Sequence, residues 1–444
     1  MNKKINILIV LTCLLLTGCS KKETLEVTEE NIIVVSSEIA KAFQDGNYSE
    51  VYNVLNKESK KDVTKDKIKS GWDSIISDAG TFNSMDVKAY RPDDRDLGYV
   101  IFDYENKTIK LSLRFDDKMN VERMNINEVH KIVEAIETED FIESNVQVGY
   151  GNMLDGMLTL PKGVDNPPVV ILLQGSGSSN LNEEILVNKP FEDLAHGLAK
   201  QGIASIRYDK RYYAYPEWDS IREVSLAWEY FNDFSAVVHQ LEDMPVNHNE
   251  IYLIGHSQGG VLAPRLAYEH PEIKGFISLA GSVRGLEEVI KDQQINALLA
   301  QGFTMDELSG QIKSIDDNIA KIQSLTKETA DDYVIWNLPL TYWYELNQSR
   351  AKIYANELQC DMLILQGEED FQVFVDSDYV EWQKLFEGMD NVQFRSYPGL
   401  NHLFMPSIEG TTADYEVPAH IDDSVIKDIT SWIQNRKLVK EEKK

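Results

Sequence analysis

The sequence predicts an α/β protein, in which a large domain with a mostly parallel sheet flanked by helices follows a smaller α+β domain. Two observations support this prediction. At 444 residues the chain exceeds what a single hydrophobic core usually organises. The hydrophobic period also changes along the chain, from helices followed by alternating strands to apolar strands that alternate with helices. We expect the two domains to cover residues 29–135 and 136–444.

The N-terminus has the pattern of a targeting segment. Lys3 and Lys4 precede an apolar run over 5–16 that is too short to span a bilayer comfortably. The run ends in Leu16-Thr17-Gly18-Cys19, which resembles the lipobox of bacterial lipoproteins. The resemblance implies a signal peptide over 1–18, a lipidated Cys19 and a charged tether over 19–28. The alternative is an ordinary secretory signal in which the cysteine occurs by chance.

The lipobox resemblance also predicts a location. Two acyl chains give stable membrane attachment, so we expect the protein at the extracytoplasmic face of a cell membrane, anchored through Cys19. Cys13 would leave with the signal peptide, and Cys360 would remain as the single unmodified cysteine. No intrachain disulfide is then available, and the fold must depend on its hydrophobic core.

The overall charge excludes one class of partner. A formal net charge of -29 argues against nucleic-acid binding, because phosphate recognition needs clustered Lys and Arg. We interpret the acidity as a source of solubility. The sequence leaves the oligomeric state open.

The small domain combines helices with an antiparallel meander. Helical spacing predicts helices over 29–45, 48–56 and 65–77, and alternation then predicts strands over 87–90, 98–104, 108–115 and 120–127. This order resembles the cystatin-like and nuclear-transport-factor-like domains of some bacterial lipoproteins. We find no catalytic constellation in it, and we interpret His130 as a surface or packing residue.

In the large domain, apolar strands alternate with helices, which is typical of a parallel sheet. After a hairpin over 146–150 and 153–160, apolar runs predict buried strands over 169–173, 204–208, 251–254, 276–279, 362–365 and 392–396. Helices are expected over 190–200, 226–241, 260–269, 376–386 and 421–432. The alternation of strands and helices is interrupted between about 282 and 359 by a mostly helical insertion. This insertion predicts a cap over the C-terminal edge of the sheet, which is the edge at which ligands bind. The insertion contains a cluster of aromatic residues, for which we favour core packing over a role in a pocket wall. They are Tyr333, Trp336, Tyr342, Trp343 and Tyr344.

Ser257 is the candidate nucleophile. It stands at the centre of Gly255-His256-Ser257-Gln258-Gly259, after an apolar strand and before a helix, which is the pattern of a nucleophile elbow. The sharp turn leaves no room for side chains at Gly255 and Gly259, and it holds the serine in a strained conformation that exposes its hydroxyl. We do not assign His256 as a base, because its place beside Ser257 in the chain directs it elsewhere.

A serine hydroxyl needs a base and an orienting carboxylate, which should follow in the order Ser, Asp or Glu, His. His402 lies in a loop after the last predicted strand and is our base, whereas His420 fits the start of the terminal helix. Asp370 follows the preceding strand and is our acid, in a Gly-x-x-Asp-x-x-Val pattern. Glu368 and Glu369 read as solvated turn residues. Asp376 is a weaker alternative that resembles the N-cap of the next helix.

The oxyanion hole needs two backbone N–H groups. One is expected from Gln258 at the start of the helix, where the exposed amides favour negative charge. The other is expected from Ser176, with Gly177 behind it, in the glycine-rich loop after the strand 169–173. This loop lacks the Lys-Ser/Thr ending of a phosphate-binding P-loop.

Several motifs together resemble one family from residue 141 to the end of the chain. They are Gln174-Gly175-Ser176-Gly177, Arg207-Tyr208-Asp209-Lys210-Arg211, Leu279-Ala280-Gly281-Ser282 and Gly399-Leu400-Asn401-His402. They look like landmarks of the bacterial α/β-hydrolases grouped with serine aminopeptidases, dienelactone hydrolases and prolyl-oligopeptidase-type domains. Relatives usually have a glycine where this chain has Tyr212, so substrate preference is not carried over. We interpret Arg207 to Arg211 as mainly structural.

These residues predict an α/β-hydrolase fold and a serine hydrolase that cleaves a small carboxylic ester through Ser257, Asp370 and His402, with no metal and no cofactor. A second hypothesis is a serine aminopeptidase or amidase, which we rank lower because no residue is identified that would bind a free α-amino group. A third hypothesis is a lipid-anchored binding module that has lost its activity. The complete triad argues against it.

Overall fold

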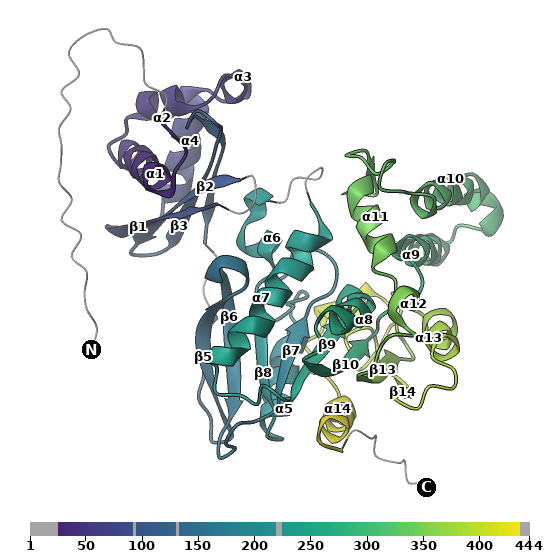
Figure 1. Cartoon of the computed structure of the whole chain (residues 1–444). Coiled ribbons are helices and arrows are strands. Elements are labelled where there is room, and N and C mark those ends of the chain that lie inside the picture. The colour runs from purple at the N-terminus through teal and green to yellow at the C-terminus, as the bar shows by residue number, and fades with distance from the viewer. Residues whose placement is uncertain (1–24, 92–94, 130–132, 219–223, 436–444) are drawn as a thin grey trace, which may run out of the picture. The chain divides into compact units, whose positions relative to one another are not determined.

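The computed structural model describes residues 25–91, 95–129, 133–218 and 224–435 (Figure 1). The predicted signal peptide, Cys19 and His130 lie outside these ranges. Contacts divide the chain into two compact units, residues 1–131 and 132–444, which are described separately below. Within the described residues, no helix has both the length and the apolar character that crossing a bilayer requires.

The N-terminal unit has the predicted order of helices followed by an antiparallel sheet in the order β1-β2-β3-β4. Its elements are α1 (Glu29–Gln44), α2 (Tyr48–Val54), α3 (Ser59–Asp62), α4 (Lys65–Ile76), β1 (Phe82–Tyr90), β2 (Asp96–Tyr104), β3 (Thr108–Phe115) and β4 (Val121–Glu128). Strand β1 begins five residues before its predicted start at 87. Residues 82–86 are exposed, so they lack the alternation that marks a half-buried strand.

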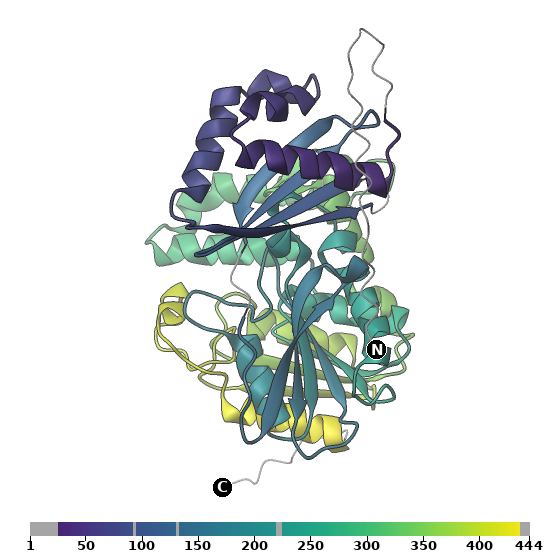
Figure 2. The same ribbon diagram turned by 90° about the vertical axis from the view of Figure 1, so that its left-hand side faces the viewer.

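The core of this unit lies between the helices and one face of its sheet (Figure 2). Ile109, Leu111 and Leu113 alternate along β3 and are buried against Phe43 of α1 and Trp72 of α4. Both helices begin at a threonine whose hydroxyl accepts a backbone N–H: Thr28 from Asn31 and Thr64 from Lys67. The unit therefore has an apolar core and capped helices of its own.

The large unit is built on an eight-stranded sheet with the order β14-β13-β10-β9-β7-β8-β6-β5. The strands are β5 (Phe141–Val148), β6 (Leu154–Pro161), β7 (Val169–Leu173), β8 (Ala204–Tyr208), β9 (Ile251–His256), β10 (Ile273–Leu279), β13 (Asp361–Gly367) and β14 (Val392–Tyr397). The hairpin β5–β6 is antiparallel and adds to β8, and the six remaining strands are parallel to one another. Strand β5 begins at Phe141, five residues before the predicted hairpin.

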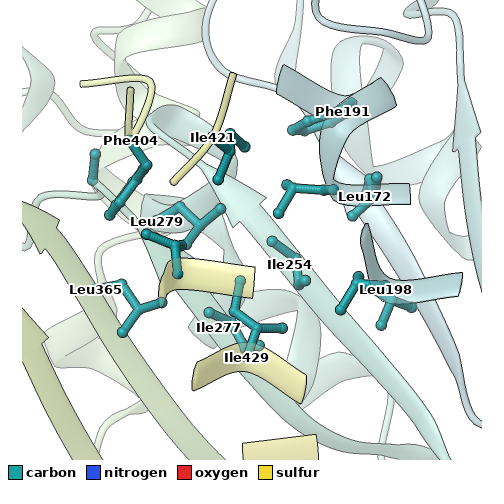
Figure 3. Close-up of a cluster of buried hydrophobic side chains, with 14 of the residues drawn as sticks. Leu172, Phe191, Leu198, Ile254, Ile277, Leu279, Leu365, Phe404, Ile421 and Ile429 are labelled. Carbon is teal, nitrogen blue, oxygen red and sulfur yellow. The ribbon is translucent and has the colours of Figure 1, made fainter. Parts of the chain in front are cut away.

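Two helices cover one face of this sheet. Phe191 and Leu198 of α5 (Pro190–Ala199) and Ile429 of α14 (Asp423–Asn435) pack on Leu172 and Ile254 of the central strands (Figure 3). Helix α8 (Gln258–Glu269) packs against β9 and β10. Helix α7 (Asn232–Gln240) continues from a π-helical turn over Ala227–Phe231. Helices α6 (Arg211–Ala214) and α13 (Val380–Leu385) follow β8 and β13.

The predicted cap is present between β10 and β13 (Figure 1). It contains α9 (Leu286–Ala300), α10 (Met305–Gln323), α11 (Leu340–Gln348) and α12 (Ala351–Tyr354), together with a short hairpin of β11 (Val334–Ile335) and β12 (Leu338–Pro339). The fold is therefore the predicted α/β-hydrolase fold with a helical insertion. Because parallel strands end at the same edge of a sheet, the loops after β7, β8, β9, β13 and β14 come together there.

Candidate active site

Ser257 stands in a strained turn between β9 and α8. Its backbone has φ +50° and ψ −116°, which a residue with a Cβ rarely adopts. A Cβ placed on Gly255 would lie 2.3 Å from the carbonyl oxygen of Gly259, and one on Gly259 would lie 2.3 Å from that of Leu173. Gly255 thus lets β9 and α8 approach closely, as predicted, and Gly259 lets α8 approach β7.

His402 and Asp370 form a buried pair. The Nδ1 atom of His402 lies 2.7 Å from Oδ2 of Asp370, and both residues are buried. The same carboxylate accepts the side-chain amide of Gln366 through Oδ2 and the backbone N–H groups of Gln372 and Val373 through Oδ1. Hydrogen bonds thus fix both carboxylate oxygens of Asp370. Hydrogen bonding of Nδ1 to the carboxylate leaves Nε2 as the nitrogen that can exchange a proton.

His256 joins the elbow to the loop that carries His402. Its Nε2 donates to the backbone carbonyl oxygen of His402 at 3.0 Å, and its Nδ1 lies 2.9 Å from Oε1 of Glu183. A carbonyl only accepts and a carboxylate also accepts, so both ring nitrogens carry protons when Glu183 is ionised. Burial disfavours this charged ring, but the charge and hydrogen bond of Glu183 and the His402 carbonyl outweigh it and raise the pKa of His256.

The loop after β7 lies directly beside Ser257. A Cβ on Gly175 would lie 3.1 Å from Cβ of Ser257. The backbone N–H of Gly175 donates to Glu183 at 2.6 Å, and that of Ser257 donates to the carbonyl oxygen of Leu279 at 2.8 Å. These two amides are therefore occupied. The next residues in each loop, Ser176 and Gln258, line the same cavity as Ser257.

This cavity has a volume of about 610 Å³ and opens between the strand ends and the cap. Its apolar wall comes from α8, α9, α11 and β12, and includes Val261, Val289, Ile290, Leu338 and Leu346. The volume is within the usual range for small-molecule sites.

The aromatic residues of the cap have different roles. Tyr342 lines the cavity, whereas Trp343 is fully buried and donates to the carbonyl oxygen of Ile335. Tyr333 is 57% exposed, and its ring lies 3.8 Å from the ammonium of Lys321. Core packing and a pocket wall are thus both represented in this cluster.

The other histidine and carboxylates that the sequence offers as candidate base and acid are not part of the His402–Asp370 pair. His420 is exposed and pairs with Asp193 of α5 at 2.8 Å. Glu368 and Glu369 are exposed turn residues. The predicted N-cap role of Asp376 is wrong, because the turn begins at Val375 and the carboxylate that accepts the Phe374 N–H is that of Asp378.

Sequence reasoning missed a buried polar network beside the site. Lys210 donates to the carbonyl oxygen of Gly175 and to Glu229, whose other oxygen accepts the hydroxyl of Tyr342. Burial, opposed by the charge of Glu229, lowers the pKa of Lys210.

From the sequence, the motif from Arg207 to Arg211 is interpreted as mainly structural, and nothing in the pattern distinguishes the role of its lysine from that of its two arginines. Arg207 pairs with Glu143 and Arg211 with Asp233, both buried within the unit.

Comparisons with known proteins agree with this fold. The family model described as "Serine aminopeptidase, S33" matches residues 188–407. Esterase EstD of Thermotoga maritima is 31% identical over 307 residues, which cover 68% of this chain and 70% of the relative. The chain therefore belongs to the α/β-hydrolase family that includes this esterase.

Solved structures similar to this one have a lower sequence identity to this chain than Esterase EstD has. Est1E from Butyrivibrio proteoclasticus aligns with a TM-score of 0.40 and 18% identity, over 62% of this chain and 96% of that one. The Pyrococcus furiosus esterase Pf2001 aligns with a TM-score of 0.37 and 17% identity, over 58% and 83%. Residues 36–124 match a family described as "Protein of unknown function (DUF3887)". The resemblance of this domain to cystatin-like and nuclear-transport-factor-like domains stays a prediction.

Proposed function

We propose that this hydrolase cleaves small carboxylic esters through a triad of Ser257, Asp370 and His402. The observation that carries the proposal is the buried His402–Asp370 pair, whose loop is tied by His256 to the elbow that holds Ser257. The strained serine and the adjoining apolar cavity support it. The similarity to Esterase EstD favours an ester as the substrate class.

The proposed chemistry needs only residues of this chain. Ser257 Oγ attacks the ester carbonyl carbon while Nε2 of His402 takes the hydroxyl proton, and Asp370 stabilises the resulting imidazolium. The backbone N–H groups of Ser176 and Gln258 donate to the oxyanion of the tetrahedral intermediate. Collapse breaks the ester C–O bond, and His402 gives its proton to the leaving alcohol. Water then attacks the acyl-enzyme by the same route, which releases the acid and restores Ser257.

A fluorophosphonate probe tests the nucleophile. We expect it to label the wild-type protein covalently and to leave Ser257→Ala unlabelled, because only an activated serine attacks the phosphorus. Ser235→Ala is a matched control, since the Ser235 hydroxyl contacts Nε2 of His270 at 3.0 Å but lies within α7. Labelling should persist in this control. A folded wild-type protein that resists the probe would overturn the proposal.

A serine aminopeptidase is the second candidate, because the matching family model carries that description. Such an enzyme needs a carboxylate for the substrate α-ammonium group. The acidic side chains among the residues that line the cavity are Glu229 and Glu287, and they pair with Lys210 and Arg350. We therefore expect p-nitrophenyl acetate and butyrate to be hydrolysed at least about 100-fold faster, by kcat/KM, than leucine or alanine p-nitroanilide, a difference of about 2.7 kcal/mol. The reverse preference would establish the peptidase.

We further propose that the enzyme is lipid-anchored through Cys19 at the extracytoplasmic face of a cell membrane. The lipobox-like Leu16-Thr17-Gly18-Cys19 and the short apolar run before it support this proposal. An anchor would keep the catalytic domain beside the membrane and leave its substrate choice to the cavity.

A further inference from the structure

The carbonyl oxygen of Gly175 accepts two hydrogen bonds from buried side chains. Lys210 Nζ lies 2.8 Å from it and the hydroxyl of Tyr230 lies 2.6 Å from it. The two donors come from the loop after β8 and from the π-helical turn before α7. Two elements thus converge on one peptide group in the loop beside Ser257.

That peptide group joins Gly175 to Ser176. A trans peptide is planar, so its N–H points away from its C=O, and fixing the carbonyl of Gly175 also fixes the direction of the Ser176 N–H. A cationic donor on the carbonyl additionally polarises the peptide, which makes the N–H a stronger donor. Orientation and polarisation are what an oxyanion-hole amide requires.

Lys210 is itself held with all three of its N–H groups engaged. Besides the carbonyl of Gly175, it donates to Oε1 of Glu229 at 2.5 Å and to the hydroxyl of Tyr230 at 2.8 Å. The Lys210 and Glu229 side chains are only 2% and 7% exposed. A buried ion pair adds little net stability compared with apolar residues of similar volume, so stability alone does not account for it.

The same network reaches the second proposed oxyanion residue. Oε2 of Glu229 accepts the hydroxyl of Tyr342 at 2.7 Å, and this hydroxyl accepts Nε2 of Gln258 at 2.9 Å. Tyr342 belongs to α11 of the cap, so the chain of hydrogen bonds runs from the cap to the start of α8 and to the loop after β7. Each hydroxyl in it donates once and accepts once.

We propose that Lys210 and Tyr230 are positioning residues for ester hydrolysis, which act by holding and polarising the Gly175–Ser176 peptide so that its N–H stabilises the transition-state oxyanion. This inference rests on the proposed function. It assigns Lys210 a role distinct from its neighbours Arg207 and Arg211, whose partners are the buried carboxylates of Glu143 and Asp233.

The test compares Lys210→Met, Tyr230→Phe and a matched control in the full-length protein. Arg395→Met removes another partly buried cation, which pairs with Asp428 of α14. For p-nitrophenyl butyrate we expect Lys210→Met to lower kcat about 10- to 100-fold with KM within about 3-fold of wild type, below the 10²–10³ lost with a whole oxyanion donor. Tyr230→Phe, which leaves the lysine in place, should lower kcat about 3- to 10-fold.

A second readout separates positioning from general damage. The affinity for an alkyl boronic acid, which forms a tetrahedral anion on the serine, should fall by about the same factor as kcat, because it uses the same N–H. Arg395→Met should keep both values within about 2-fold of wild type. If Lys210→Met does not fold, as judged by circular dichroism, Tyr230→Phe decides, since it removes a single hydroxyl.

Three outcomes would overturn the inference. They are an unchanged kcat in the folded variants, an equal loss in Arg395→Met, and a loss of kcat with boronate affinity intact. The failure of the proposed function looks different, because wild type would then hydrolyse no ester and bind no boronate. An active wild type with unaffected variants removes only the positioning role.

Discussion

His256 and Ser257 are neighbours in the chain but serve different parts of the site. Ser257 faces the cavity at the strained turn, whereas His256 is buried between Glu183 and the carbonyl of His402. Glu183 also accepts the N–H of Gly175, so one carboxylate connects Gly175 with the elbow and, through His256, with the loop that carries His402. Gain or loss of a proton by this buried imidazole therefore links the stability of the site to pH.

The raised pKa of His256 sets the sign of that dependence. A group whose pKa is higher in the folded than in the unfolded state contributes stability in full below the unfolded value, about 6.5, and loses it as pH rises through the folded value. We expect the urea midpoint to fall with rising pH above about 6.5. Glu183→Gln should flatten this slope, because it removes the charge that holds the proton.

His420→Gln is the control for this measurement. His420 also pairs with a carboxylate, that of Asp193, but its side chain is 87% exposed, so solvent screens the interaction. Its slope should match that of wild type. Equal slopes for wild type and Glu183→Gln would contradict the assignment.

At the scale of elements, the elbow shows how backbone contact limits residue choice. Where a side chain would begin, Gly255 of β9 has main-chain atoms of α8, and Gly259 of α8 has main-chain atoms of Leu173 in β7. Backbone cannot move aside as the end of a flexible side chain can. By contrast, Gly310 in α10 of the cap has open space around its Cβ position.

Alanine substitutions should therefore have opposite effects at these two glycines. Gly259→Ala should lower the free energy of unfolding by about 2–4 kcal/mol, because its Cβ would meet Leu173 O. Gly310→Ala should raise it by about 0.5–1 kcal/mol, since alanine favours the helix without a clash. Chemical denaturation monitored by circular dichroism measures both. A tolerated Gly259→Ala would show that the elbow can relax.

At the scale of the whole molecule, the chain joins a capped hydrolase unit to a small α+β unit with a core of its own. The proposed membrane attachment is lipid on Cys19, which lies outside the described residues.

Substitution of the lipobox cysteine tests the anchor. We expect wild type to sediment with membranes when produced in a bacterial host and to have a diacylated Cys19 as its mature N-terminus by mass spectrometry. Cys19→Ala should appear in the soluble fraction or keep its signal peptide, because no thiol remains for lipid transfer. An unmodified mature N-terminus at another residue would refute the anchor, and Cys360→Ala, which keeps the lipobox, should behave as wild type.

Much of the fold and of the site could be predicted because its signals are local. A nucleophile elbow is contiguous, so its strand, glycines, serine and helix can be read within about twenty residues, and the chain order of the fold then directs the search to Asp370 and His402. Apolar runs and alternation likewise predict the strands of the four-stranded and eight-stranded sheets, whereas the short β11–β12 hairpin of the cap has no such signal. Residues 82–86 and 141–145 were missed, because their exposure or polar partners hide the alternation.

The order of the elements, the elbow and the residue types of the proposed triad can be inferred from the sequence alone. Which buried charges lie beside Ser257 becomes visible only in the folded structure. Lys210 and Gly175 are 35 residues apart and His256 and His402 are 146 apart, and a buried lysine looks the same in a sequence as a solvated one. The physical reason is that burial and pairing arise when the ends of parallel strands meet, which no local pattern records.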